Sequence, residues 1–252
     1  MEKILIKQYK KPKLNSPLLI GGLPGIGNVG KIAAEYIVDK LKMQKLLEIF
    51  SQYFPPQVFV SEEGVTYLVR NSVYYKKLAG RSDLMVLVGD FQGTTQEGQY
   101  ELSYNTLEVL SKFNLKTIYT LGGYSMGKIV ESPRVLGAVT DNSMISTLSS
   151  LGVVFPKGEP GGGIIGSAGV MLGLGKELFS IDGACLMGET SGFFADPRSA
   201  LNVLKILSKI IRVEMDLSDM EARSQQMEQI TGKAAEEFQQ RSQQREDLGY
   251  FG

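Results

Sequence analysis

Two overlapping glycine motifs near the start of the chain have the spacing of phosphate-binding loops. Gly25, Gly27 and Gly30 spell G-x-G-x-x-G, and the stretch from Gly25 to Lys31 spells G-x-x-x-x-G-K. Both follow an apolar run and open an amphipathic stretch, a context in which backbone amides and a helix N-terminus bind phosphate. A P-loop also needs Ser or Thr after the lysine to hold magnesium, and this chain has Ile32 there. We therefore expect these glycines to form a tight strand-to-helix turn and to allow close packing of the helix on the sheet, with no nucleotide site.

A third glycine motif, residues 123–127 (GYSMG), matches the G-x-S-x-G nucleophile elbow of hydrolases. The chain contains no histidine, which excludes Ser-His-Asp and Cys-His catalysis and zinc sites built from imidazole. Lys128 could serve as a base, but Pro133 follows shortly, where a hydrolase would continue into a helix. We interpret the motif as a glycine-rich loop at the carboxyl edge of a sheet and expect no nucleophile at Ser125.

Four acidic residues are predicted to lie near strand ends, where paired carboxylates could act as general acid and base. They are Asp90, Glu97, Glu189 and Asp196. Helix capping and loop solvation explain such residues more often than catalysis does, so we expect no catalytic cluster. The single cysteine, Cys185, lies in an apolar run and is interpreted as a core residue. The sequence therefore indicates no catalytic residue, no cofactor and no metal site.

Glycine also recurs through the predicted helix from Ile164 to Phe179. The glycines are Gly166, Gly169, Gly173 and Gly175. Because glycine costs a helix up to about 1 kcal/mol per residue relative to alanine, this density indicates close backbone packing, a ligand or a subunit interface. Close packing is our preferred interpretation.

The composition is that of a globular protein with balanced charge. The chain has 252 residues, of which 43% are hydrophobic and 21% charged, so it can bury a large core. Its 27 basic and 27 acidic residues cancel, which argues against binding to nucleic acid or to an anionic membrane surface. The weakly polar stretch from Ile164 to Gly175 is too short to span a bilayer, and the charged N-terminus is unlike a signal peptide. We expect a cytoplasmic protein.

Short apolar runs alternate with amphipathic helical patterns along the chain. Strands are predicted over Pro17–Ile20, Lys45–Phe50, Leu84–Val88, Thr117–Leu121 and Ile181–Met187. Helices are predicted over Gly30–Lys42, Gln96–Phe113, Asn142–Leu151, Ile164–Phe179 and Pro197–Ile211. A hairpin is predicted between Gln57 and Tyr75. Because the last three strands are nearly continuous apolar runs, this alternation predicts a layered α/β fold with a mainly parallel sheet.

The sequence changes character after Ile211. Ser218 and Glu221 have the spacing of a capping box, so a helix is expected to begin there. Its apolar positions are sparse, which suits a helix–helix contact with a neighbouring subunit or projection into solvent. Over residues 219–246 this helix would be about 42 Å long. We therefore divide the chain into an α/β core of residues 1–213, a helical extension of residues 214–247 and a tail of residues 248–252.

Five segments carry a pattern that is more specific in combination than any one of them alone. They are residues 22–31, the loop 132–135, the glycine stretch 166–173, the segment 182–192 (DGACLMGETSG) and residues 196–211. In this order they resemble the archaeal and bacterial proteasome assembly chaperone family of the subunit-two type. The resemblance runs from about residue 15 to about residue 230.

This resemblance implies a three-layer α/β fold of the phosphorylase/hydrolase-like kind, with a mixed, mainly parallel sheet and a long C-terminal helix. It also implies a homo-oligomer that binds the α subunits of the 20S proteasome without ATP and without catalysis, as an assembly chaperone or an activator. Members dock through a C-terminal tail that ends in hydrophobic-Tyr-any residue. Here Tyr250 takes the hydrophobic position, Phe251 stands where tyrosine is expected, and Gly252 supplies the terminal carboxylate.

Two alternatives stay open at this point. The chain could be a small-molecule enzyme that acts on nucleosides or phosphorylated ligands through the loops at Gly25–Gly30 and Gly123–Gly127. The aromatic tail could also fold back onto its own domain, as chain ends often do. The sequence does not set the number of subunits, the need for a paralogue, or the choice between an assembly intermediate and the mature protease as partner.

Overall fold

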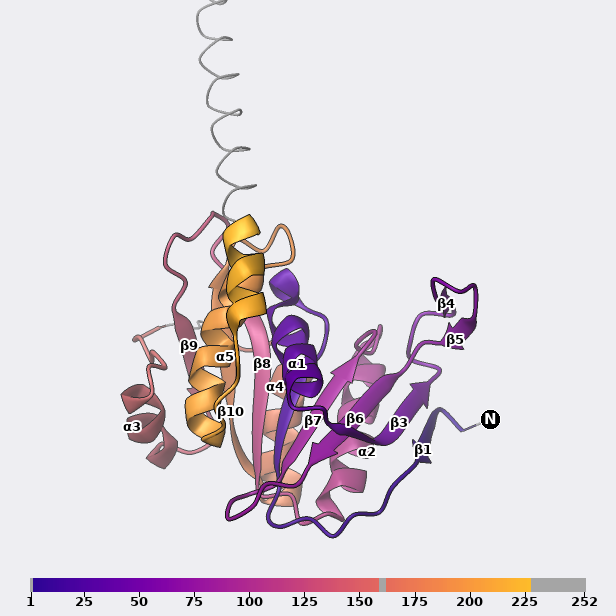
Figure 1. Cartoon of the computed structure of the whole chain (residues 1–252). Helices are drawn as coiled ribbons and strands as arrows, with labels where there is room; N and C mark the ends of the chain where they lie inside the picture. Colours follow the sequence, from indigo (N-terminus) through magenta and orange to yellow (C-terminus); the bar gives the residue numbers. More distant parts are fainter. Residues whose placement is uncertain (1, 159–161, 228–252) are drawn as a thin grey trace, which may run out of the picture.

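The computed structural model describes residues 2–158 and 162–227 of the chain. Eight strands in this part form one sheet, in the order β1-β3-β6-β7-β2-β8-β10-β9. They are β1 (Ile4–Gln8), β2 (Leu18–Gly22), β3 (Gln44–Ser51), β6 (Asn71–Lys76), β7 (Leu84–Gly89), β8 (Thr117–Ser125), β9 (Val135–Val139) and β10 (Asp182–Thr190). The central strands β7, β2, β8 and β10 pair in parallel, and the outer pairs are antiparallel. Figure 1 shows β1 and β9 at opposite edges of the sheet.

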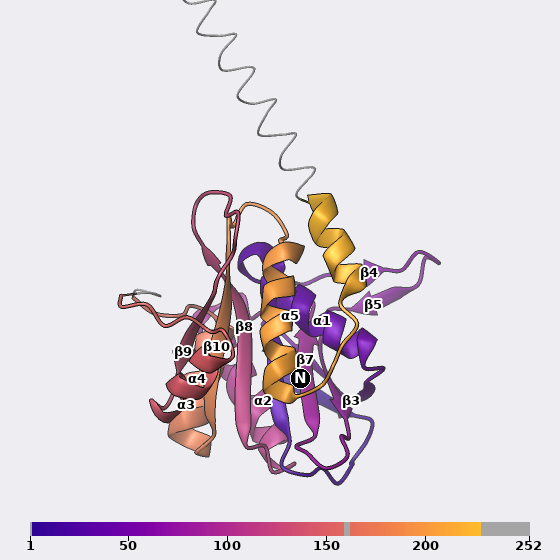
Figure 2. The ribbon, with the colours of Figure 1, turned by 60° about the vertical axis from the view of Figure 1, so that its left-hand side comes forward.

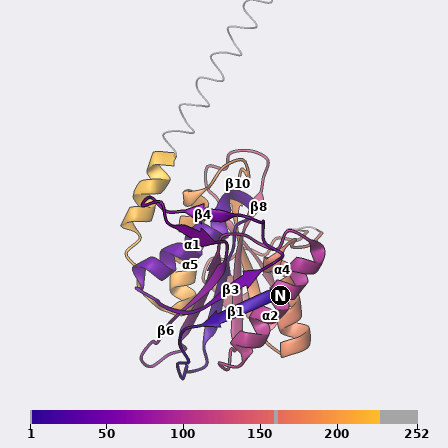
Figure 3. The same cartoon turned by 90° about the vertical axis from the view of Figure 1, so that its right-hand side faces the viewer.

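Helices cover both faces of the sheet. On one face lie α1 (Val29–Lys40) and α5 (Pro197–Ile211), and on the other lie α2 (Gln96–Ser111) and α4 (Ser167–Phe179), as Figure 3 shows. A shorter helix, α3 (Ser143–Ser150), contacts the edge strand β9. Because strand side chains alternate between faces, Leu19 enters the core under α2 and α4 while Ile20 enters the core under α1 and α5. These two cores confirm the predicted three-layer α/β fold.

Local sequence accounts for the ends of the helices around this sheet. At the start of α5, Asp196 Oδ1 accepts the Ser199 N–H at 2.9 Å, and Pro197 occupies the first helical turn. At the start of α4, Gly166 has a φ of 88°, a left-handed conformation that favours glycine and excludes a helix there. The helix therefore begins at Ser167, three residues later than the prediction from Ile164.

Three strands of the main sheet, β1, β6 and β9, were not predicted from the sequence. The apolar run of β1, Ile4 to Ile6, is only three residues long and does not alternate, so it gives a weak strand signal, and four of the five β1 side chains are exposed. The predicted hairpin is confirmed as β4 (Val58–Val60) and β5 (Thr66–Leu68), a separate two-stranded sheet. The following β6 belongs instead to the main sheet, between β3 and β7.

A further helix spans residues 218–227 of the described part, and Figure 2 shows it beside α1 and α5. Its first turn differs from the predicted capping box. The Asp216 carboxylate accepts the Ser218 N–H at 3.0 Å, and the Glu221 carboxylate lies 3.2 Å from Lys205 Nζ on α5. Asp216, rather than Ser218, therefore bonds the first free N–H of this helix.

The helix over residues 218–227 is attached to the core. Met220 is 0% exposed, and the Tyr36 hydroxyl on α1 donates to the Asp216 carbonyl oxygen at 2.7 Å. The rest of the predicted extension and tail lies outside the described residues, so the division at residues 213 and 247 stays a prediction. Among residues 2–158 and 162–227, none of the helices combines the length and apolarity that crossing a membrane requires.

Candidate functional site

A cavity of about 770 Å³ opens at the carboxyl edge of the central parallel strands. Its walls come mainly from four segments: residues 23–26 after β2, 91–92 after β7, 121–125 at the end of β8, and 163–166 before α4. The two glycine motifs that the sequence analysis considered for chemistry therefore lie on one cavity.

The glycines of the first motif shape the turn from β2 through a short 3-10 helix, η1 (Ile26–Asn28), into α1. Gly27 has a φ of 61°, and a Cβ there would lie 2.8 Å from Thr190 Oγ1. A Cβ on Gly30 would lie 2.3 Å from the Leu121 carbonyl oxygen. A Cβ on Gly25 would have ordinary room, with its nearest neighbour at 3.7 Å. The predicted role in close packing is thus confirmed for Gly27 and Gly30.

Two glutamines hold the walls of the cavity together. Gln92 Nε2 donates to the Pro24 carbonyl oxygen at 2.5 Å, and Gln92 Oε1 accepts from the Ser167 N–H at 2.9 Å and from Gln99 Nε2 at 3.2 Å. Gln99 Oε1 in turn accepts from the Ser167 hydroxyl at 2.7 Å. This network joins the loops after β2 and β7 to α2 and α4. The sequence carries no signal for either glutamine, because an isolated Gln belongs to no motif.

The electrostatics of the cavity do not suit phosphate. Among the described residues that line it, none is Asp, Glu, Lys or Arg. The Ser167 N–H at the N-terminus of α4 already donates to Gln92, and Lys31 Nζ lies 3.5 Å from Glu35 on α1. A phosphate entering the cavity would lose its hydration without gaining a cation. The arrangement instead favours a neutral ligand.

The second motif does not form a nucleophile elbow. Strand β8 continues through Gly123, Tyr124 and Ser125 in register with β10, so these residues are strand and not the loop that we predicted. The Ser125 hydroxyl donates to the Ser191 carbonyl oxygen at 3.3 Å. A nucleophile elbow requires a sharp turn into a helix at the serine, and an extended strand does not provide it.

The four acidic candidates are bound to separate partners. Asp90 accepts the Arg70 N–H at 3.0 Å, Asp196 accepts the Ser199 N–H at 2.9 Å, Glu189 accepts the Arg134 N–H at 2.8 Å, and Glu97 accepts from Lys3 at 2.7 Å. Within residues 2–158 and 162–227, no group of His, Cys, Asp and Glu is arranged to hold a metal ion. Asp196 therefore caps a helix, as we expected, whereas Asp90 and Glu189 accept hydrogen bonds from backbone N–H groups and Glu97 forms an ion pair.

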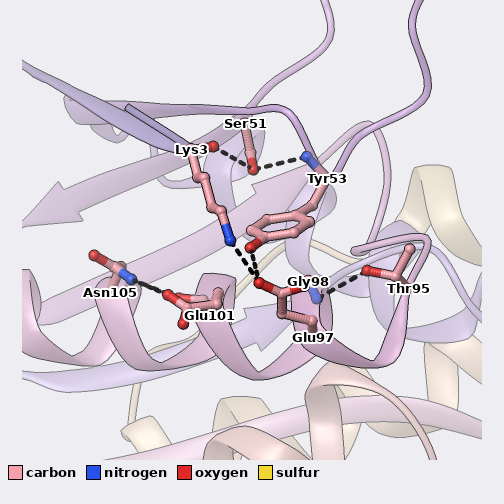
Figure 4. A network of polar contacts seen from close by, with 8 residues as sticks. All are labelled: Lys3, Ser51, Tyr53, Thr95, Glu97, Gly98, Glu101 and Asn105. Carbon is pink, nitrogen blue, oxygen red and sulfur yellow. Dashed lines mark hydrogen bonds and ion pairs between the residues drawn. The ribbon is translucent and has the colours of Figure 1, made fainter. Parts of the chain in front are cut away.

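The contacts of Glu97 show why this carboxylate is structural. Figure 4 shows Lys3 and Tyr53 both meeting Glu97 near the start of α2, with the Tyr53 hydroxyl donating to Glu97 Oε1 at 2.7 Å. Two residues before Glu97, the Thr95 hydroxyl accepts the Gly98 N–H at 3.0 Å and caps the helix. The network joins the N-terminal strand region to α2 on an exposed surface.

Cys185 is a core residue, as its apolar surroundings predicted. Its side chain is 0% exposed on β10, and burial raises the pKa of its thiol to about 11. A thiol with so high a pKa holds almost no thiolate at neutral pH, so Cys185 is not an activated nucleophile.

The glycines of α4 divide into two kinds. A Cβ on Gly169 would lie 2.2 Å from the Ile164 carbonyl oxygen, and a Cβ on Gly175 would lie 2.9 Å from Ile118 Cδ1. Close packing, our preferred interpretation, is therefore confirmed for these two positions. Gly173 differs, because a Cβ there would have no atom of the described residues within 4 Å apart from its chain neighbours and the nearby backbone of α4 itself.

The three residues predicted to contact a partner lie outside the described residues. Tyr250, Phe251 and Gly252 are the last residues of the chain, and the described part ends at residue 227. Their role stays a prediction.

Comparison with known proteins gives a consistent family assignment. The model of the family described as the PAC2 family matches residues 19–235. The chain is 36% identical over 260 residues to the uncharacterized protein MJ1210 of Methanocaldococcus jannaschii, covering 100% of this chain and 99% of that protein. The predicted family resemblance is confirmed by these matches.

Two solved structures from Pyrococcus furiosus share the fold. PbaB, described as an archaeal proteasome activator, has a TM-score of 0.88 and 36% identity, covering 93% of this chain and 100% of PbaB. PbaA, described as an archaeal homolog of proteasome-assembly chaperone, has a TM-score of 0.76 and 23% identity, covering 98% of each chain. At 23% identity, the similarity to PbaA shows a shared fold and nothing about function.

Proposed function

The chain belongs to the PAC2 family, and we propose that it is a proteasome-binding protein of the activator type that works without ATP and without catalysis. The observation that carries this proposal is the similarity to PbaB, an archaeal proteasome activator, at 36% identity over the whole PbaB chain. The likeness to PbaA is weaker in sequence, which favours the activator over the assembly chaperone. The proposed partner is the α-ring of the 20S proteasome.

We place the contact with the proteasome in the last three residues. Burying the Phe251 side chain in a pocket would contribute about 1.5 to 3 kcal/mol, and a charge-assisted bond to the Gly252 carboxylate about the same. A single tail would therefore bind weakly. In a homo-oligomer whose tails match the spacing of the pockets, avidity would strengthen binding by about a hundred-fold or more.

The start of the extension supports this arrangement. Met220 is buried against the core, and Tyr36 holds the backbone at Asp216, so the segment leading to the tail begins from a fixed point. A fixed base reduces the conformational entropy that docking would otherwise cost. The extension is proposed to carry the tail to the α-ring.

The test of tail docking is deletion of Tyr250, Phe251 and Gly252. The truncated protein should keep its oligomer mass and lose co-sedimentation with purified archaeal 20S proteasomes.

Two matched variants separate the contribution of the Phe251 ring from that of the Gly252 carboxylate. Phe251→Tyr restores the family hydroxyl and should bind at least as tightly, whereas one alanine added after Gly252 keeps both aromatic rings but displaces the carboxylate and should bind weakly. Undiminished binding by the truncated protein would refute the mechanism.

The activator role is tested with mature particles. Adding the full chain to 20S proteasomes without nucleotide should raise the rate of peptide hydrolysis, and the truncated chain should not. Binding to free α subunits with no effect on mature particles would identify an assembly chaperone instead.

A further inference from the structure

We propose that the cavity at the carboxyl ends of β2 and β8 binds an uncharged, largely apolar small molecule that carries a hydrogen-bonding group. The connection from β2 leads through α1 toward β3 on one side of the sheet, while β7 leads through α2 to β8 on the other. Open α/β sheets bind ligands at such a switch point. The cavity volume of about 770 Å³ is within the range of about 300 to 1,000 Å³ found for small-molecule sites.

Apolar side chains dominate the lining. Leu23, Phe91, Ile164 and Met187 all contribute to the walls. Ile165, which also lines the cavity, is 97% exposed at its mouth. An apolar ligand would remove this surface from water, which is favourable in proportion to the apolar area buried.

The polar side chains of the walls restrict the charge of the ligand. Gln92 and Gln99 form hydrogen bonds to each other and to Ser167, so most of their hydrogen-bonding groups already have partners within the protein. None of the described lining residues carries a charge. A charged ligand would be desolvated with no counter-ion, which is strongly unfavourable. The walls are also preorganised, because the same bonds tie two loops to two helices.

A buried hydroxyl next to the cavity points to a hydrogen bond with the ligand. Thr120 is 1% exposed, its Oγ1 has no oxygen or nitrogen hydrogen-bond partner among the described residues, and the group that interacts with it is the Cys185 thiol, a weak hydrogen-bonding group. It lines an inner recess of about 20 Å³ that shares Leu23, Gln92, Leu121 and Ala168 with the main cavity. A buried hydroxyl that has only a thiol beside it keeps part of the free-energy cost of leaving water. A ligand with a hydroxyl or carbonyl group at its inner end would recover that free energy.

A pair of probes that differ only in charge tests the class of ligand. We expect the full chain to increase the fluorescence of the neutral dye 6-propionyl-2-dimethylaminonaphthalene. We expect 2-naphthol to displace the dye and 2-naphthyl phosphate, which has the same ring system, to compete at least about tenfold less well, since the walls provide no cation. Equal or better competition by the phosphate would overturn the proposal of a neutral site.

Gly122 offers a variant that fills the cavity without disturbing the fold. Period-two alternation places Thr120 and Gly122 on the same face of β8, and a Cβ on Gly122 would meet only Met187 Cγ, at 3.8 Å. Gly122→Phe should therefore occupy the part of the cavity next to Thr120, where the hydrogen-bonding end of the ligand is proposed to lie, and weaken dye binding at least about tenfold. Gly122→Ala leaves most of the volume open and should stay within about twofold of the original chain.

Three further results complete the test. Gly122→Phe should keep the circular dichroism spectrum and cooperative thermal unfolding, which shows that loss of dye binding comes from the filled cavity. Thr120→Val should weaken binding of 2-naphthol, which can bond to the hydroxyl, more than binding of naphthalene, which cannot. No dye binding by the full chain, or dye binding that Gly122→Phe leaves intact, would overturn the site. The tail-deleted chain should bind the dye normally, so this outcome is independent of proteasome docking.

Discussion

The Arg134 guanidinium and the Arg134 backbone N–H both donate to the Glu189 carboxylate. Arg134 Nε lies 2.8 Å from Glu189 Oε1, and the N–H lies 2.8 Å from Oε2. Glu189 is 2% exposed near the end of β10, and Arg134 immediately precedes β9. The pair therefore anchors the segment between β8 and β9 to the buried end of β10.

This pair predicts a loss of stability in acid. Burial alone would raise the pKa of the Glu189 carboxyl, but the hydrogen bonds from Arg134 outweigh burial and hold that pKa below the ordinary value of 4.5. A carboxyl with a lowered pKa in the folded state stabilises the fold above its unfolded pKa and loses that contribution as pH falls through the folded value. The free energy of unfolding should therefore decrease as the pH is lowered below about 4.5.

Glu189→Gln isolates this contribution. At neutral pH the variant should lower the free energy of unfolding by about 2 kcal/mol, because it replaces charge-assisted hydrogen bonds with neutral ones. The difference from the original chain, measured by urea unfolding, should shrink as the pH falls below the ordinary carboxyl pKa. Glu62→Gln, in the exposed β4–β5 turn, serves as the control and should change stability by less than about 0.5 kcal/mol at neutral pH. A constant difference across the acid range would show that the charge of Glu189 contributes nothing.

Two glycines of one motif should differ in how much the same substitution destabilises the protein. Gly30→Ala would bring a Cβ to 2.3 Å from the Leu121 carbonyl oxygen, so we expect it to lower the free energy of unfolding by about 1 to 3 kcal/mol. Gly25→Ala meets its nearest atom at 3.7 Å on an extended backbone and should change stability by less than about 0.5 kcal/mol. Urea unfolding followed by circular dichroism measures both. A larger effect at Gly25 would contradict the packing role.

The sequence predicted the layers of the fold because their signals are local. Apolar runs such as Leu84–Val88 and the amphipathic pattern of Pro197–Ile211 are set by the burial of one or both faces, and the structure places them as β7 and α5. The edge strand β1 carries only a weak signal, because its apolar run of Ile4 to Ile6 is short and does not alternate with polar residues. Its pairing with β3 depends on residues about forty positions later in the chain.

The candidate site was predicted only in part, because the sequence shows local patterns and does not show which distant residues come into contact. Gly27 and Gly30 were expected to pack closely, because glycine spacing is visible in the sequence. Gln92, Gln99 and Thr120 were not named, because their importance arises from three elements that meet in space. The absence of histidine excluded whole classes of catalysis, but it could not reveal a cavity.

Cys185 should be inert toward thiol reagents in the folded protein. Its side chain is fully buried, and burial raises its pKa to about 11, so little thiolate is present and reagents cannot reach it. Reaction with 5,5'-dithiobis(2-nitrobenzoate) at pH 8 should be at least about a hundredfold slower in the native protein than in urea. Rapid reaction of the native chain would show that β10 opens readily or that the thiol is exposed.

Gly173 and Gly169 provide a matched test on one helix. Gly173→Ala introduces a methyl group into open space on α4 and should raise the free energy of unfolding by about 0.5 to 1 kcal/mol, because alanine is the better helix former. Gly169→Ala brings a Cβ to 2.2 Å from the Ile164 carbonyl oxygen and should lower it, despite the same gain in helix propensity. Thermal unfolding of both variants at two protein concentrations measures the difference. If Gly173→Ala instead destabilises the protein, and does so more at the lower concentration, then a second copy of the chain packs on this face of α4 and requires the glycine.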